Sequence, residues 1–240
     1  MFLAEGVHLA QEALRSGAEV ELAVFSERLS TSEEGRSLRL ALERAGIPHV
    51  EMADGVLDSI QDARSPQPVM LIAHRRRPAA GSGLERSQAP RLVVVAGGIQ
   101  DPGNLGALLR TGDAAGATAC CVTAGSADPY HPRAVRATSG AIFRLPVHVD
   151  SEPSLVRRLR EHGLHLIATD ARSGVEYDHC DLTRCVAVLF GAEGPGLPSR
   201  LRDTVDEAVR IPLRTGVDSL SVGAAAAVVL FEAARQRRAR

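Results

Sequence analysis

Two polar side chains stand where an expected strand turns into an expected helix. Residues 101–111 read Asp-Pro-Gly-Asn-Leu-Gly-Ala-Leu-Leu-Arg-Thr and follow the apolar run 92–95. Ligands in α/β proteins bind outside the carboxyl ends of the strands, so such a junction is a place for chemistry. Asn104 either caps the helix or contacts a ligand. Arg110 is either solvated or pairs with an anion.

A glycine-rich segment follows a later apolar strand. Residues 190–198 read Phe-Gly-Ala-Glu-Gly-Pro-Gly-Leu-Pro, directly after the apolar run 185–189. Glycine lacks a Cβ and accepts positive φ, so this backbone either approaches a ligand closely or simply makes a tight turn. The G-x-x-G-x-G spacing differs from the G-x-G-x-x-G fingerprint of dinucleotide-binding folds, which argues against a nicotinamide-dependent oxidoreductase.

A third segment precedes the last helix. Residues 211–213 (Ile-Pro-Leu) and 218–223 (Asp-Ser-Leu-Ser-Val-Gly) lead into a helix predicted over 219–237. Four consecutive alanines at 224–227 allow another helix to approach closely. That face either packs in the core or forms an interface.

Alternating strands and helices must position these three segments. Apolar runs separated by helical stretches predict a mostly parallel sheet covered on both faces. The predicted strands are residues 92–95, 119–122, 146–149, 165–168, 186–189 and 208–211.

The first third of the chain predicts a separate small α/β unit. Helices are predicted over 5–15, 37–45 and 56–63, and strands over 20–25, 49–52 and 69–73. Residues 75–90 collect Pro, Gly and Ser without periodicity, which predicts a linker. The expected organisation is therefore a first domain of residues 1–74, a linker of 75–90 and a second domain of 91–240, with a core in each.

Composition narrows the class of protein. The chain has 240 residues, 45% of them hydrophobic, and a net charge of −1, which argues against a protein that coats nucleic acid nonspecifically. All 28 basic residues are arginine. Their runs at 75–77, 157–160 and 235–240 are either solvated faces or RNA contacts. With two Tyr, five Phe and no Trp, RNA contacts are expected to be mostly electrostatic.

The chain shows no pattern for a membrane span, a signal peptide or a metal site. No apolar run is long enough to cross a bilayer and no signal sequence is evident, so a cytoplasmic location is expected. The four cysteines show no C-x-x-C pair and no histidine at ligand spacing, so we expect no metal.

The three segments together resemble the three motifs of the SpoU (TrmH-type) branch of the SPOUT RNA methyltransferases. The resemblance covers residues 91–240 in order and spacing, and residues 1–74 are similar to the ribosomal-protein-like substrate-binding domain that precedes the catalytic domain in many members. It implies S-adenosyl-L-methionine as cofactor, RNA as substrate, a homodimer with the active site across its two-fold axis, and a deep trefoil knot in the catalytic domain.

The resemblance also assigns roles to residues of this chain. Arg110 would carry the reaction. Arginine is a poor general base, because its pKa stays above about 12, so we expect it to bind the target phosphate and stabilise the developing alkoxide. Glu193 would either hold the loop geometry or pair with Arg110. The other catalytic positions would be Asn104 and Ser219.

Cofactor and RNA contacts carry over in the same way. The cofactor would be bound by Thr169, Gly191, Glu193, Gly196, Ile211, Leu220 and Ser221. Arg136 would join Arg110 in contacting RNA. The family typically has Asn at the position of Ser221, and the shorter hydroxyl side chain lacks the paired geometry of an amide.

The expected function is transfer of a methyl group to a ribose 2′-hydroxyl, with 23S-type ribosomal RNA favoured over tRNA because of the first domain. A tRNA 2′-O-methyltransferase remains an alternative. A non-catalytic RNA-binding relative is another, and the substitution at Ser221 is its support.

Overall fold

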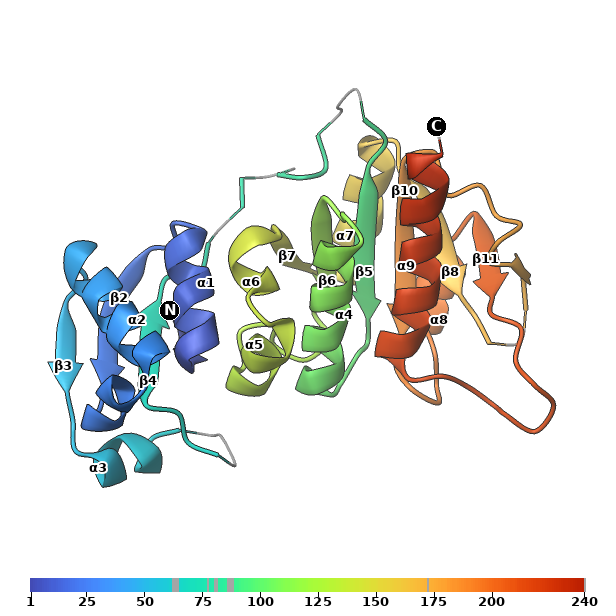
Figure 1. The fold of residues 1–240 in the computed structure, drawn as a ribbon. Helices are drawn as coiled ribbons and strands as arrows, with labels where there is room; N and C mark the ends of the chain where they lie inside the picture. The colour runs from blue at the N-terminus through green and yellow to red at the C-terminus, as the bar shows by residue number, and fades with distance from the viewer. Residues whose placement is uncertain (62–64, 77, 80–81, 86–88, 172, 240) are drawn as a thin grey trace.

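Two β-sheets, each with its own helices, make up the structure (Figure 1). The computed structural model describes residues 1–61, 65–76, 78–79, 82–85, 89–171 and 173–239. Within these described residues, the first sheet, at the N-terminal end, has four strands, and the second has seven. This arrangement confirms the α/β class predicted from the sequence.

The N-terminal sheet is mixed. Its elements are β1 (Phe2–Glu5), α1 (Val7–Arg15), β2 (Val20–Phe25), the 3-10 helix η1 (Glu27–Thr31), α2 (Glu33–Arg44), β3 (His49–Glu51), α3 (Asp54–Ser59) and β4 (Val69–Ala73). The strand order is β1-β4-β2-β3. β4 pairs antiparallel with both β1 and β2, and β3 is parallel to β2.

Every strand pairing of the second sheet is parallel. Its strands are β5 (Leu92–Gly97), β6 (Ala119–Thr123), β7 (Val147–Asp150), β8 (His165–Thr169), β9 (Val175–Glu176), β10 (Val186–Gly191) and β11 (Glu207–Arg210). They lie in the order β7-β6-β5-β10-β8-β11-β9. The chain therefore crosses from β7 over the sheet to β8, and then returns to insert β10 between β5 and β8.

Helices cover both faces of this sheet, as the apolar strands require. They are α4 (Pro102–Ala114), α5 (Pro132–Thr138), α6 (Ala141–Arg144), α7 (Glu152–Glu161), α8 (Ser199–Arg202) and α9 (Val222–Arg238). Val94 and Val188 face the core beneath α4, α5 and α9. Val93 and Val95 pack with α7 and α8 on the other face. The trefoil knot stays a prediction from the resemblance.

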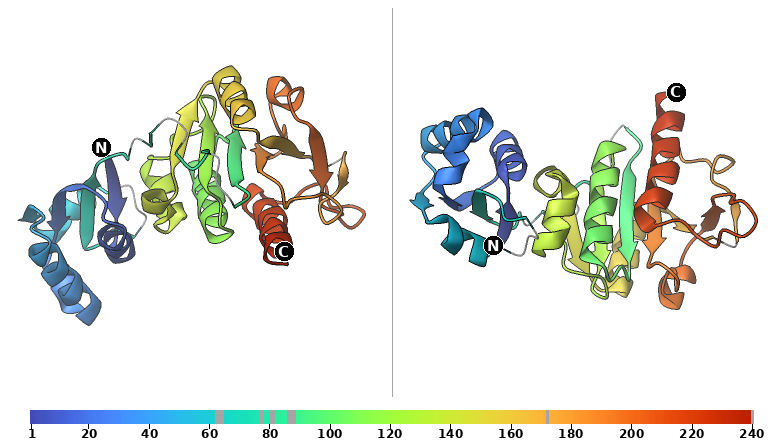
Figure 2. Two further views of the ribbon diagram at one scale, coloured as in Figure 1. Left: turned by 90° about the horizontal axis from the view of Figure 1, so that it is seen from above. Right: turned by 60° about the horizontal axis from the view of Figure 1, so that its bottom comes forward.

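The two sheets share a core where β1 meets α5 and α6. One continuous cluster of buried apolar side chains includes residues of both sheets, in contrast to the two cores expected. Phe2 bridges them, because its ring lies 5.1 Å from that of Tyr130 and 5.8 Å from that of Phe143. Charges reinforce the contact: Arg144 pairs with Glu12 across it. Figure 2 shows α5 and α6 lying next to the N-terminal unit.

The predicted N-terminal helix over residues 5–15 was wrong at its start. Residues 2–5 form β1, and the helix begins only at Val7 after Gly6, whose φ of 106° favours glycine. α2 begins at Glu33, earlier than predicted, because Ser32 caps it and accepts a hydrogen bond from the Gly35 N–H at 3.0 Å. Residues 62–63 of the predicted third helix lie outside the described residues.

The predicted linker is partly anchored on the second sheet. The Leu84 side chain is fully buried against the sheet. Thr118 donates a hydrogen bond to the Gly83 carbonyl at 2.7 Å, and His148 Nε2 lies 2.8 Å from the Ser82 carbonyl. Residues 77, 80–81 and 86–88 of this segment lie outside the described part of the chain.

Candidate functional site

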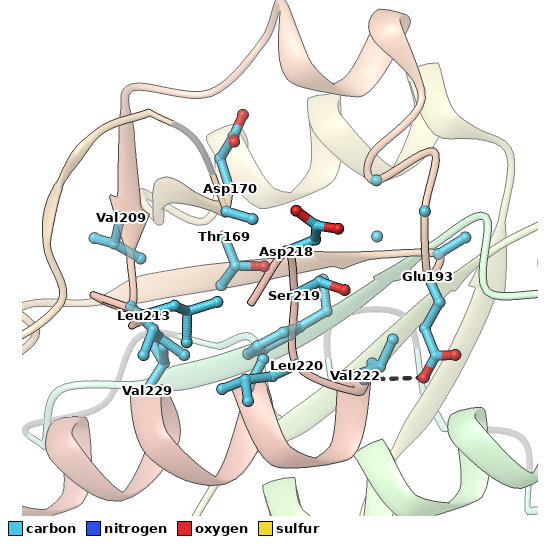
Figure 3. Close-up of a pocket in the computed structure, with 18 residues that line it drawn as sticks. Thr169, Asp170, Glu193, Val209, Leu213, Asp218, Ser219, Leu220, Val222 and Val229 are labelled. Atoms are coloured by element: carbon cyan, nitrogen blue, oxygen red, sulfur yellow. Dashed lines mark hydrogen bonds between the residues drawn. The ribbon is translucent and has the colours of Figure 1, made fainter. Parts of the chain in front are cut away.

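A cavity of about 210 Å³ opens at the carboxyl ends of β8, β10 and β11, next to the start of α9 (Figure 3). Parallel strands end on one edge of the sheet, so loops far apart in sequence meet there. Most residues assigned to the cofactor by resemblance line the cavity: Thr169, Gly191, Glu193, Gly196, Ile211 and Leu220, and with them Ser219. Ser221 is absent from the lining.

The glycine segment forms one wall of the cavity by folding back on itself. Ala192 and Gly196 exchange two backbone hydrogen bonds of 3.1 and 3.0 Å. Gly194 and Gly196 have positive φ, 84° and 71°. A Cβ at Gly191 would lie 2.2 Å from the backbone carbonyl carbon of Gly196. The segment is therefore a tight turn and a cavity wall at once.

Asn104 does not cap α4. The N-cap residue is Asp101, whose carboxylate accepts a hydrogen bond from the Asn104 backbone N–H at 2.9 Å. Pro102 follows it at the first helical position. The Asn104 side chain is therefore available, and its amide donates to Glu193 Oε1 at 3.1 Å. An N-cap aspartate followed by proline was the signal in the sequence for this arrangement.

Glu193 joins three segments. Its Oε1 accepts the bond from Asn104 and also lies 3.4 Å from the Val222 backbone nitrogen at the start of α9 (Figure 3). The first N–H groups of a helix lack partners within it, and the helix dipole favours a carboxylate there. Of the two predicted roles for Glu193, the geometry matches the one that holds the loop.

Ser221 caps α9. Its hydroxyl accepts a hydrogen bond from the Ala224 N–H at 3.4 Å, and the helix begins at Val222 instead of the predicted residue 219. Serine is among the preferred residues at this position.

Arg110 lies apart from the cavity. Its side chain is exposed on α4 and makes no hydrogen bond or ion pair with any residue that the structure describes. Residues six positions apart on a helix point about 120° away from each other, so Arg110 and Asn104 face different directions. Within one chain, the two polar residues of the first motif do not meet.

Arg136, predicted to contact RNA, is engaged inside the chain. Its guanidinium pairs with the carboxylate of Glu5, whose side chain is 1% exposed. The partner lies on β1, so this ion pair ties α5 to the N-terminal sheet. Arg133, one turn earlier, lies 3.2 Å from the Asp101 carboxylate that caps α4.

The motifs did not single out two acidic residues of the cavity. Asp170 follows β8, and Asp218 directly precedes Ser219; both line the cavity. Their positions just after a strand and just before the last helix were the only signal in the sequence.

Other groups bear on the predictions about metals and membranes. Glu176, Asp178 and His179 offer ligand atoms within 4.8 Å of one another, an arrangement common among exposed acidic residues without an ion. The four cysteines are free, and burial raises the pKa of Cys121 to about 12. In the described part of the chain, no helix combines the length and apolar character needed to cross a bilayer.

Two family models and curated relatives match this chain. The SpoU rRNA Methylase family matches residues 91–231, and the MRM3-like substrate binding domain matches residues 1–71. The chain is 30% identical over 96% of its length to the 23S rRNA (guanosine(2553)-2′-O)-methyltransferase RlmP of Bacillus subtilis, covering 87% of that protein. It is 33% identical over 97% of its length to the 23S rRNA (guanosine-2′-O-)-methyltransferase RlmB of Bordetella pertussis, covering 96% of it.

Solved structures are similar over nearly the whole chain. The SpoU methyltransferase AviRb from Streptomyces viridochromogenes, crystallised with AdoMet, superposes with a TM-score of 0.85 at 28% identity, covering 99% of this chain and 90% of that one. The structure of an RNA 2′-O ribose methyltransferase superposes with a TM-score of 0.83 at 33% identity, covering 99% of this chain and 89% of that one.

Proposed function

Because this chain belongs to the SpoU rRNA methylase family, we propose that it transfers the methyl group of S-adenosyl-L-methionine to a ribose 2′-hydroxyl of ribosomal RNA. The observation that carries the proposal is the cavity at the ends of β8, β10 and β11, lined by residues from two of the three motifs. The relatives named for 23S rRNA favour ribosomal RNA over tRNA.

The cavity suits the cofactor. Ile211, Leu213 and Leu220 supply the apolar walls that an adenine needs, and the glycine turn exposes backbone groups for hydrogen bonds. When bound, the cofactor supplies an activated methyl group on a sulfonium. Ser219 would donate a hydrogen bond beside it, and Glu193 holds the glycine segment against α9 through Val222.

Arg110 would act on the RNA. Its guanidinium keeps its proton, so it would bind the phosphate next to the target ribose and stabilise the oxygen as the hydroxyl ionises. The hydroxyl proton passes to water or to the phosphate, the ribose oxygen forms the new bond to the methyl carbon, and the sulfur keeps the electron pair of the bond that breaks. Exposure of Arg110 leaves it accessible to such a partner.

We also propose that two chains complete each other's sites. Phe231 on α9 is 45% exposed, and Ala224 on the same helix and Ala114 on α4 are exposed as well. α4 and α9 lie side by side (Figure 1), so we take the surface that these two helices form as the pairing face. A two-fold pairing over this face would bring Arg110 of one chain toward the cavity of its partner.

Residues 1–74 would serve as the substrate-binding domain, 75–90 as linker and 91–240 as the catalytic domain. The substrate-binding match over residues 1–71 supports this division. Bacterial rRNA is the substrate named for the relatives, which supports a cytoplasmic location, and cell fractionation tests it.

Single-turnover methylation of 23S rRNA and of tRNA transcripts tests the function. We expect product with rRNA. Arg110→Ala should lower the rate a few hundredfold, the usual effect of losing one oxyanion donor, while S-adenosylhomocysteine binding stays intact. A wild-type chain that binds the cofactor but methylates neither RNA would support the non-catalytic alternative instead.

Mixing two inactive variants tests the shared site. Ala225→Phe should fill the cavity from α9, because Ala225 lines it, and Arg110→Ala should remove the catalytic cation. If Arg110 acts on the partner's cavity, re-associated mixtures regain about one quarter of the wild-type sites. A monomer by light scattering, or a mixture without activity, would contradict the proposal.

A further inference from the structure

The cavity has two chemically different ends (Figure 3). Val209, Leu213 and Val229 gather at one end and form an apolar floor. Asp170, Glu193 and Asp218 carry the only charges among the described lining residues, and all three are acidic. A ligand that fits both ends has an apolar part and a positively charged part.

Asp218 differs from Glu193 in having no side-chain partner among the residues that the structure describes. Glu193 Oε1 is already bonded to Asn104 and Val222. Asp218 is exposed and makes no hydrogen bond or ion pair with residues the structure describes. Its carboxylate is directed away from the apolar floor, into the space between the end of β8 and the segment that carries Glu193 (Figure 3).

The reaction changes the charge of the cofactor. S-adenosylmethionine carries a sulfonium, an ammonium and a carboxylate, so its net charge is positive. Once the sulfur keeps the electron pair of the broken bond to the methyl carbon, the sulfonium charge is gone and S-adenosylhomocysteine is neutral overall. A carboxylate at the cavity therefore interacts more favourably with the substrate form than with the product form.

We propose that Asp218 is a specificity-determining residue that makes the cavity prefer the cationic cofactor over its neutral product. The inference rests on the proposed role of this cavity as the cofactor site. Product would then leave more readily than substrate, because the attraction to Asp218 is lost in the same step that transfers the methyl group. Exposure of Asp218 keeps the effect modest, since water screens the charge.

Calorimetry of the full chain with three ligands tests the proposal. The ligands are S-adenosylmethionine, S-adenosylhomocysteine and sinefungin, which has an ammonium group in place of the methylated sulfonium. Asp218→Asn should lower the affinity for the two cationic ligands about fivefold and leave the affinity for S-adenosylhomocysteine unchanged. A fivefold change is about 1 kcal/mol, the Coulomb energy of two unit charges about 4 Å apart in water.

A matched control removes the same charge elsewhere. Glu19→Gln neutralises an exposed carboxylate just before β2 and should change none of the three affinities. In about 1 M salt, where the screening length is about 3 Å, the wild-type preference should approach that of Asp218→Asn.

The outcomes separate this inference from the proposed function. If Asp218→Asn lowered the affinity for all three ligands equally, selection by cofactor charge would be overturned, because the lost contact would then bind a group that all three ligands share. Unchanged affinities for all three would overturn it as well. A wild-type chain that binds none of the ligands would instead refute the cofactor site itself.

Discussion

Asn104 and Glu193 should act as one unit in binding the cofactor. Hydrogen bonds to charged groups contribute about 1.5–3 kcal/mol when buried, and the exposure of Glu193 reduces the 3.1 Å bond from Asn104 to about 1 kcal/mol. The contact of Glu193 with the Val222 N–H at 3.4 Å adds about 0.3–1 kcal/mol as a carboxylate at a helix N-terminus. Replacing Glu193 therefore removes more stabilising free energy than replacing Asn104, because Glu193 makes both contacts and Asn104 makes only one of them.

A double-mutant cycle on S-adenosylhomocysteine affinity measures this coupling. A free-energy change of about 1.4 kcal/mol corresponds to a tenfold change in Kd. If binding loses the free energy that holds the glycine segment in place, Asn104→Ala should raise Kd about fivefold and Glu193→Ala about ten- to thirtyfold. The double variant should bind no worse than Glu193→Ala, which gives a coupling energy of about 1 kcal/mol.

The control is Asp203→Ala, which removes an exposed carboxylate of a residue outside the cavity lining and should leave Kd unchanged. Additive effects of the two single variants would refute the reasoning, because the bond between them would then contribute nothing to the bound state. A smaller rise in Kd for Glu193→Ala than for Asn104→Ala would also refute the reasoning.

Three further predictions concern stability. The Arg237 side chain donates hydrogen bonds to four backbone carbonyls, those of Leu182, Pro90, Arg91 and Arg184. Arg237→Met should therefore lower the free energy of unfolding, measured by urea titration, by about 3 kcal/mol. A loss of less than about 0.5 kcal/mol would contradict this. Burial lowers the pKa of His148, so the folded chain binds fewer protons there than the unfolded chain. Stability should then fall as pH drops below about 6.5, and His148→Asn should flatten that part of the stability curve against pH. Gly106→Val should disrupt the packing of α4 on α5, because even a Cβ would lie 2.3 Å from the Ala134 carbonyl oxygen; circular dichroism melting that matches wild type would count against it.

Much of the second sheet could be predicted from the sequence, because its strands are short apolar runs between helical stretches. Buried parallel strands such as β5 and β10 have this pattern by necessity, since helices cover both of their faces. The four-residue β1 lacks such a run, and its Glu5 is polar yet buried against Arg136, so periodicity gave no sign of a strand. The two-residue β9 is shorter than any periodic pattern can reveal.

The site was predictable where backbone conformation dictates residue type. Gly191 and Gly196 are glycines because the turn leaves no room for a side chain or requires positive φ. The six-residue spacing of Asn104 and Arg110 on one helix already indicates that they point apart, but the position of Arg110 relative to the cavity depends on how α4 is oriented beside α9. The cap of α4, by contrast, had a signal in the sequence, because Asp101 is followed by Pro102 and this pair marks the start of a helix.

The placement of β10 between β5 and β8 has a consequence for synthesis on the ribosome. β5 ends at Gly97, and its neighbour on one side, β10, ends at Gly191. At about 5–20 residues per second, roughly 5–20 s pass before that neighbour emerges. The N-terminal sheet, by contrast, has all its strands once Ala73 is made. During the interval one side of β5 has no strand to pair with, and such long-range pairing is slow to form. Folding of the cavity at the ends of β8, β10 and β11 is therefore among the last events, and a nascent chain stalled before α9 would carry a finished N-terminal sheet but no cavity.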